Sequence, residues 1–319
     1  MADLKTDDRG QLLLVGAFIL AAAFVVLALV VNSAIFTENL ATRDDVPGSQ
    51  DALEYRDEVR RGVGDIIRDT NHNNSRTASD AQGSIEQLGA VAGIDQAVRN
   101  RVVSVSHVST QPGIKIAQDQ PRELTNNASS DDWTLATDVN RTRNVRLNVT
   151  DFNSGTVEFV VNGTSDEWVM SISETGAGTD AEVTVSTPGG TTSSCVRENT
   201  DTIFVDVTAG TVDGEPCPAL SRLSDGTEMQ FGAGVDPGYN ISIRNGDAVE
   251  GMYSMILEDV GGAGAFDPLG GNNYGSAPDE PYYLTGSGVV YSITVHYEFY
   301  TPQVGFETDV RAAPGEVAG

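Results

Sequence analysis

The chain has 319 residues and a formal net charge of −27, with 46 acidic residues against 19 basic ones. Such an acidic surface repels nucleic acid and anionic lipid headgroups, so a nucleic-acid-binding function is excluded. At molar salt the screening length falls to about 3 Å and the self-repulsion largely vanishes, so the composition favours a high-salt environment, with an acidic secreted protein of ordinary salinity as the alternative.

Residues 11–36 contain no charged side chain, and residues 12–31 are apolar apart from one glycine. Twenty residues of helix cover ~30 Å, about the hydrocarbon thickness of a bilayer. We therefore predict a single-pass transmembrane anchor helix over 11–36 in the cell membrane. It follows a cytoplasmic leader over 1–10 and leaves the bulk of the chain extracellular. The alternative is a cleaved secretory peptide, but the apolar cores of such peptides span only about 7–15 residues.

Two amphipathic helices are predicted after the anchor, because Pro47 and Gly48 interrupt the first helix and Ser49 is a suitable N-cap for the next. Their expected bounds are 50–69 and 77–105, since apolar residues recur at helical spacing in both. The second of these helices is expected to lay one stripe on a core, formed by Ile85, Leu88, Val91, Val98, Val102 and Val105. Residues 37–110 are accordingly interpreted as a helical stalk or layer.

From about residue 143 the apolar pattern has a period of two, which is typical of half-buried strands. The clearest strand is predicted over 289–300. There Tyr291, Ile293, Val295, Tyr297 and Phe299 alternate with Ser292, Thr294, His296 and Glu298. We expect a β-rich extracytoplasmic domain over 111–311, with a loop over 261–279 and a mobile tail over 312–319. The predicted fold class is α+β: an N-terminal transmembrane helix, two amphipathic helices, then an antiparallel, sandwich-like head.

The chain has two cysteines, Cys195 and Cys217. In an extracytoplasmic domain they predict a disulfide, which contributes about 3 kcal/mol in the loop-entropy description. Metal binding is the weaker alternative, because no histidine or further cysteine accompanies the pair.

No catalytic, cofactor or metal site is predicted. The histidines, His72, His107 and His296, have no ligand spacing, and no zinc-protease helix surrounds them. The chain also has no nucleophile motif of the G-x-S-x-G type and no phosphate-binding loop. The sequence therefore predicts a protein that is not an enzyme and uses no cofactor.

Potential N-glycosylation sites recur along the chain. The pattern N-x-S/T begins at Asn73, Asn127, Asn140, Asn148, Asn162 and Asn240. Asn, Ser and Thr are common here, so chance matches are the alternative. Asn148 is expected on the solvent face of a strand and Asn162 in a turn. The pattern favours a glycosylated surface protein.

The junction Arg9-Gly10-Gln11 joins a short charged leader to an abrupt apolar segment. It resembles the class III-type leader of type IV pilin-like proteins. The resemblance implies cleavage by a prepilin peptidase between Gly10 and Gln11, with the apolar helix kept as membrane anchor and assembly stem. One departure is Val15, at which many pilins carry a glutamate.

The whole chain resembles the pilin-like or pseudopilin-like single-span membrane proteins of haloarchaea, whose function is uncharacterised. The resemblance implies a membrane-anchored surface protein with a structural or assembly role. Its partners would be the lipid bilayer, a prepilin peptidase and like or related pilin-type subunits. The alternative is a monomeric anchored extracellular binding or receptor module.

Overall fold

The computed structural model of the chain describes residues 49–72, 76–175, 180–198, 200, 202–259, 273–275, 280–285 and 288–316. The predicted leader and the predicted transmembrane segment lie outside these residues. So does the predicted loop over 261–279, except for residues 273–275. Among the helices of the described residues, none is both long enough and apolar enough to span a membrane.

The predicted α+β fold class is wrong. The described chain is mostly antiparallel β-sheet, with two helices and two short 3-10 turns, η1 (Pro218–Leu220) and η2 (Gly246–Ala248). A nine-stranded sheet contains β1 (Val102–Glu123), β3 (Thr142–Phe152), β8 (Ile203–Asp206), β9 (Thr211–Val212), β10 (Glu215–Pro216), β12 (Val249–Glu258), β13 (Tyr282–Leu284), β14 (Val290–Tyr300) and β15 (Gly305–Ala312). A six-stranded sheet contains β2 (Trp133–Val139), β4 (Thr156–Asn162), β5 (Glu167–Thr175), β6 (Asp180–Ser186), β7 (Thr192–Glu198) and β11 (Tyr239–Arg244).

Strand β1 connects two parts of the molecule. Its first half, residues 102–112, pairs with β14, and its second half, residues 113–123, pairs with β12. The partner changes at Gly113, where an added Cβ would lie 3.2 Å from both the Leu257 carbonyl oxygen and the Tyr291 amide nitrogen. A glycine is therefore needed where three strands converge.

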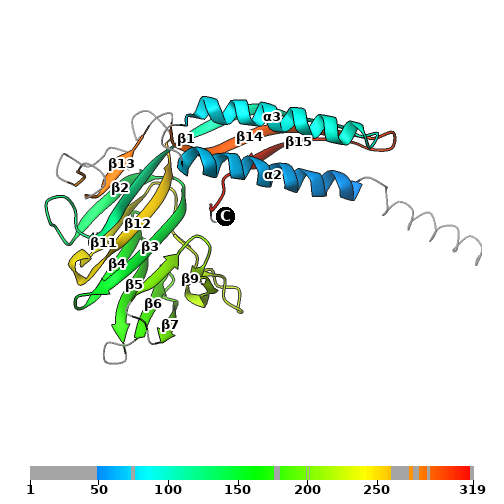
Figure 1. Cartoon of the computed structure of the whole chain (residues 1–319). Coiled ribbons are helices and arrows are strands. Elements are labelled where there is room, and N and C mark those ends of the chain that lie inside the picture. The colour runs from blue at the N-terminus through cyan, green and yellow to red at the C-terminus, as the bar shows by residue number, and fades with distance from the viewer. Residues whose placement is uncertain are drawn as a thin grey trace, which may run out of the picture.

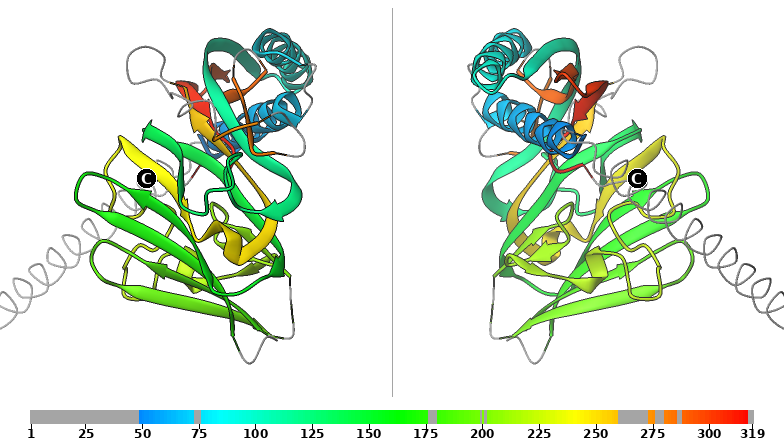
Figure 2. Two further views of the ribbon diagram at one scale, coloured as in Figure 1. Left: turned by 90° about the vertical axis from the view of Figure 1, so that its left-hand side faces the viewer. Right: turned by 90° about the vertical axis from the view of Figure 1, so that its right-hand side faces the viewer.

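We call the two parts the arm and the sandwich. The arm consists of α2 (Ser49–His72), α3 (Ala78–Ala97), residues 102–112 of β1, β14 and β15. The sandwich contains the remaining strands, in which the six-stranded sheet packs on the rest of the nine-stranded one. Figure 1 shows the arm projecting from one end of the sandwich, and Figure 2 shows both helices on one side of the arm strands.

Both parts have their own apolar core. In the arm, alternate residues of β14 and β15 meet one face of each helix, including Val63, Ile67 and Ile85, which are fully buried. In the sandwich, a larger core joins the two sheets around Trp168, whose Nε1 donates to the Met229 carbonyl oxygen at 3.1 Å. The period-two pattern produces these cores, because alternate strand residues face one side.

Helix α3 begins within one residue of its predicted start but ends earlier than predicted. It begins after Thr77, which forms a capping box with Asp80, and it ends at Ala97 instead of residue 105. Asn100 follows in the left-handed region at φ 57°, and the valines from Val102 onward belong to β1. Branched valines favour a strand, and Asn tolerates the left-handed turn that starts it.

The predicted amphipathic stripe of this helix is also incorrect. Ile85 and Leu88 pack on the arm core, but Val91 is 66% exposed and Val98 85% exposed. Strand β1 runs through residue 110, at which the helical layer was expected to end. The helices therefore cover a sheet that continues into the sandwich and do not form a separate layer.

Candidate functional site

A histidine and three carboxylates gather on the uncovered face of the arm sheet. Strand alternation directs Ile293, Val295 and Tyr297 of β14 towards the helices, so His296 and Glu298 face the other way. Glu307 and Asp309 of β15 do the same, because they alternate with residues of the arm core. We call His296, Glu298, Glu307 and Asp309 the histidine–carboxylate cluster.

The strand register brings these four residues together. His296 lies directly opposite Asp309, and Glu298 lies directly opposite Glu307. His296 Nδ1 is 2.8 Å from Asp309 Oδ1, and His296 Nε2 is 3.7 Å from Glu298 Oε1. One ligand atom each of His296, Glu298 and Glu307 lies within 4.8 Å of the other two.

The electrostatics of the cluster are dominated by negative charge. The hydrogen bond to Asp309 and the charges of Asp309, Glu298 and Glu307 raise the pKa of His296, against a smaller opposing effect of desolvation. Within the described residues, none of the ion pairs joins an arginine or lysine to these three carboxylates. The cluster can therefore attract a cation.

This cluster is not apparent from the spacing of the histidines. The three histidines have no ligand spacing with one another, and His296 is one of several polar residues on its strand. The informative signals were His296-x-Glu298 and Glu307-x-Asp309, since residues two apart on a strand share a face. The two pairs come together only because β14 pairs with β15 in the observed register, and neither short pattern contains that information.

The other two histidines lie elsewhere. His72 ends α2 and is exposed, and His107 of β1 is half-buried with its Nε2 2.8 Å from Thr110 Oγ1. Among the described residues, neither of these histidines belongs to the histidine–carboxylate cluster.

A second feature is a groove between the helices, of about 590 Å³. It is lined by acidic residues of both helices, including Glu54, Glu58 and Asp95, and by the arginines Arg99 and Arg101. Arg101 Nη2 lies 2.5 Å from Asp51 Oδ2, so the start of α2 is held beside the end of α3.

Exposed apolar side chains lie next to this end of the arm. Val91 and Ile94 of α3 and its C-cap residue Val98 follow one another at helical spacing, and Val102 opens β1; their exposed fractions are 66%, 71%, 85% and 63%. We call these four residues the α3 stripe. Because α3 also buries Ile85 and Leu88, it is apolar on two faces, and only one of them packs on the arm core.

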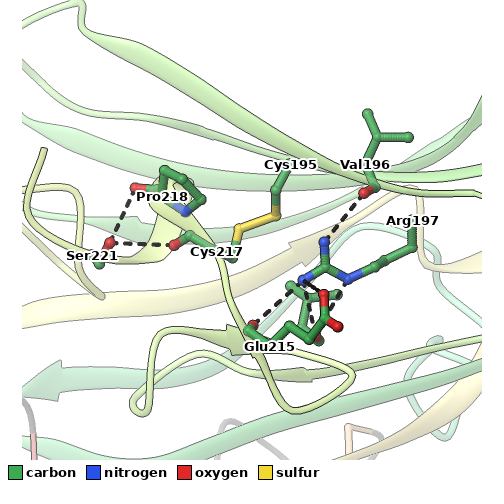
Figure 3. Close-up of a disulfide and its surroundings, with 8 residues drawn as sticks. Cys195, Val196, Arg197, Glu215, Cys217, Pro218 and Ser221 are labelled. Atoms are coloured by element: carbon green, nitrogen blue, oxygen red, sulfur yellow. Dashed lines mark hydrogen bonds and ion pairs between the residues drawn. A yellow bond between two sulfur atoms is a disulfide. The ribbon is translucent and has the colours of Figure 1, made fainter.

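The predicted disulfide is confirmed. Cys195 on β7 is bonded to Cys217, which immediately precedes η1 (Figure 3). Strand β7 is the edge of the six-stranded sheet, whereas β10, just before Cys217, is the edge of the nine-stranded sheet. Arg197 of β7 reinforces the link, since its Nη2 donates to the Val212 carbonyl oxygen at 3.0 Å. The disulfide therefore closes the sandwich where its two sheets end.

The potential glycosylation sites are dispersed over the sandwich. Gly10, Gln11 and Asn73 lie outside the described residues. Asn140 is exposed in the connection between β2 and β3, and Asn127 is half-buried in a turn. Asn148 is half-buried on β3, while Asn162 and Asn240 are half-buried and directly opposite one another at the ends of β4 and β11. Asn140 is thus the most accessible of the five described asparagines.

Among known proteins, the chain matches a family model, and that match covers only part of the chain. No curated protein and no solved structure matches the chain significantly. One family model matches residues 6–146, a range that includes the apolar segment, both helices, β1 and β2. Over these residues the chain is similar to a family of unknown function (DUF7261).

Proposed function

We propose that the protein is a membrane-anchored surface protein with a structural or assembly role, of the pilin or pseudopilin type. The apolar residues 11–36 hold the chain in the cell membrane, and the arm and sandwich lie outside the cell. The arm acts as the stem that joins the anchor to the sandwich. No catalysis is part of this role.

The α3 stripe is the observation that carries this proposal. Val91, Ile94 and Val98 expose large apolar side chains at the end of α3, which the nearby Arg101–Asp51 ion pair ties to the start of α2. Only residues 37–48 separate α2 from the apolar segment 11–36. The stripe is therefore available to a neighbouring chain that is anchored in the same membrane.

A second copy of the chain is the occupant we propose for the stripe. The neighbouring groove is lined by Glu54, Glu58 and Asp95, and such acidic residues disfavour contact with anionic headgroups. Anchoring in one membrane also raises the effective concentration of like subunits, which favours weak side-by-side contacts. Processing by a prepilin peptidase between Gly10 and Gln11 would precede this assembly.

The test uses the full-length protein in its native membrane. Chemical cross-linking is compared for the wild type, Ile94→Asp/Val98→Asp and the matched control Val196→Asp. Val196 is a 43% exposed valine of β7 in the sandwich, far from the stripe in the fold. We expect cross-linked multimers for the wild type and the control, and monomers for the stripe variant. A wild type that is found only as dispersed monomers contradicts the assembly role and favours an anchored binding or receptor module.

Two further measurements test the anchoring itself. Intact mass spectrometry of the natural protein should give a chain beginning at Gln11, and a chain beginning at Met1 or Ala2 refutes cleavage of the pilin type. Protease added outside intact cells should digest the sandwich, while the apolar segment stays in the membrane fraction. Protection of the sandwich from external protease contradicts the proposed topology.

A further inference from the structure

We propose that the histidine–carboxylate cluster binds a divalent transition-metal ion of the zinc class. His296 Nε2 and one oxygen each of Glu298 and Glu307 are the ligands, and Asp309 orients the imidazole. A water molecule completes the coordination.

The distances fit a common ion. Zinc lies about 2.0–2.2 Å from nitrogen and carboxylate ligands, so two ligand atoms at a tetrahedral angle are about 3.4 Å apart. His296 Nε2 and Glu298 Oε1 are 3.7 Å apart, and the three ligand atoms lie within 4.8 Å of one another. Glu307 is exposed, so its side chain can move to close the remaining distance.

The hydrogen bond of the histidine points to the same role. A metal displaces the proton from Nε2, and the 2.8 Å contact with Asp309 Oδ1 then holds the remaining ring proton on Nδ1, from which it donates a hydrogen bond to the carboxylate. The lone pair of Nε2 is then directed to the side of Glu298. Ligating histidines are usually held by such a carboxylate, which fixes the tautomer and makes the ligand more basic.

The charge arrangement favours a dication, because three carboxylates surround one imidazole and even a protonated His296 leaves an excess of negative charge. Glu298 and Glu307 are directly opposite one another on an antiparallel ladder, where like charges destabilise the pairing. On the other side of β14, the neighbours of His296 and Glu298 are the neutral Ser106 and Ser104 of β1. A dication bound between the strands offsets the repulsion and joins β14 to β15.

The donor set decides between classes of cation. Calcium and magnesium prefer sites built only from oxygen, whereas an imidazole with carboxylates suits zinc, manganese, nickel or copper. Zinc is therefore expected to bind in the presence of excess calcium or magnesium. This proposal does not depend on the assembly role, since no residue of the α3 stripe contributes to the cluster.

The test is isothermal titration of the full-length, chelator-treated protein with zinc chloride at neutral pH. We expect one saturable site per chain that millimolar calcium does not displace. His296→Ala and Glu298→Gln/Glu307→Gln should weaken binding at least tenfold. The controls His107→Ala and Glu86→Gln, a histidine of β1 and an exposed carboxylate of α3, should leave the affinity unchanged.

Asp309→Asn separates positioning from ligation. It should retain a single site but lower the affinity by about 10- to 100-fold, as the loss of an orienting partner does elsewhere. Zinc should also raise the melting temperature of the wild type and of His107→Ala, but not of His296→Ala. Either the absence of saturable binding or equal affinity in His296→Ala and the wild type overturns the proposal.

Discussion

Arg143 is a fully buried arginine at the place where the arm meets the sandwich. Its Nη1 donates to the Pro314 carbonyl oxygen at 2.8 Å and its Nη2 to the Val290 carbonyl oxygen at 2.6 Å. The guanidinium also lies 5.6 Å from the ring centroid of Tyr291. Burial lowers its pKa to about 10. One side chain thus connects β3, β14 and the segment that follows β15.

Arg143→Lys is expected to destabilise the protein by about 1–3 kcal/mol, because a single ammonium group cannot reproduce the two-pronged contact with separate carbonyl oxygens. The matched control is Arg146→Lys on the same strand, where a half-exposed arginine pairs with Asp206 at 2.8 Å. There the cost should stay below about 1 kcal/mol. Denaturant unfolding measures both variants, and equal losses contradict the proposed role of Arg143.

Glu316 makes the stability of the fold depend on pH. Burial raises its pKa, but hydrogen bonds from Arg311 and Tyr291 outweigh this and lower the pKa below its ordinary value of 4.5. A carboxylate with a lowered pKa in the folded state stabilises the fold above the ordinary value, and this stability is lost as the pH falls through the folded-state pKa. Residues 312–316 were expected in a mobile tail, yet Glu316 accepts a hydrogen bond from the Tyr291 hydroxyl at 2.8 Å.

We therefore expect Glu316→Gln to reduce the free energy of unfolding at pH 7, with a loss that shrinks progressively below pH ~4.5. Thermal or denaturant unfolding of both proteins across pH 3–7 measures the difference. A loss that is the same at pH 3 and pH 7 would show that the charge of Glu316 has no part in it.

At the scale of elements, α3 lies unusually close to β1. A Cβ on Gly89 would lie 2.3 Å from the Val105 carbonyl oxygen, and one on Gly93 would lie 3.3 Å from that of Val103. These two glycines, four residues apart on one helix face, let the backbone of α3 rest directly on the strand.

Gly89→Ala is consequently expected to destabilise the protein by about 1–3 kcal/mol, because the helix must move away from the strand. Gly83→Ala is the matched control in the same helix, since nothing lies within 4 Å of its added Cβ. This control should stabilise the protein by up to about 1 kcal/mol through helix propensity. Chemical denaturation distinguishes them, and two shifts of the same sign would contradict the close approach.

The disulfide acts on the edge strand β7. Removing it with Cys195→Ser/Cys217→Ser is expected to cost about 3 kcal/mol, because the unfolded chain gains the freedom of an open loop. Hydrogen exchange should accelerate most in β7 and in residues 211–217, which the bond joins. Unchanged protection of β7 in the double variant would contradict a role of the disulfide in holding this edge, since the pairing with β6 and the contacts of Arg197 would then be sufficient.

Sequence patterns were adequate for some of these elements and misleading for others. Strand β14 alternates from Ile293 to Phe299, and its pattern predicted a strand over nearly the same range. At its start the alternation breaks, because Val290 packs on the arm core and Tyr291 belongs to a separate cluster. The valines of α3 and β1 follow helical spacing by coincidence, so residues 98–105 were assigned to a helix. Spacing cannot distinguish Leu88, which packs on the core, from Val91, which is exposed. That difference is set by which side of α3 meets the sheet.

At the scale of the whole molecule, the net charge of −27 dominates. Most of the ion pairs found in the described residues are exposed or half-exposed, so they contribute little individually. Mutual repulsion of the excess carboxylates extends over about 10 Å at 0.1 M salt but only about 3 Å at 1 M.

We expect the melting temperature to rise steadily as sodium chloride increases from about 0.1 M to about 2 M, because screening removes this repulsion. Sucrose at matched water activity serves as the control, because it lowers the activity of water without screening charge. It should raise the melting temperature less than sodium chloride does. Calorimetry of the full chain measures both. A melting temperature that is independent of sodium chloride would contradict repulsion as the main charge effect.

The sequence alone was sufficient for properties that depend on local pattern and composition. These are the acidic surface, the alternation of β14, and the two cysteines that form the disulfide. The three-dimensional structure was needed wherever distant segments pair. Examples are the change of partner along β1, the exposed α3 stripe, and the meeting of His296 with Glu307 and Asp309. The physical reason is that side-chain periodicity is a property of each segment, whereas register and burial follow from the contacts between segments.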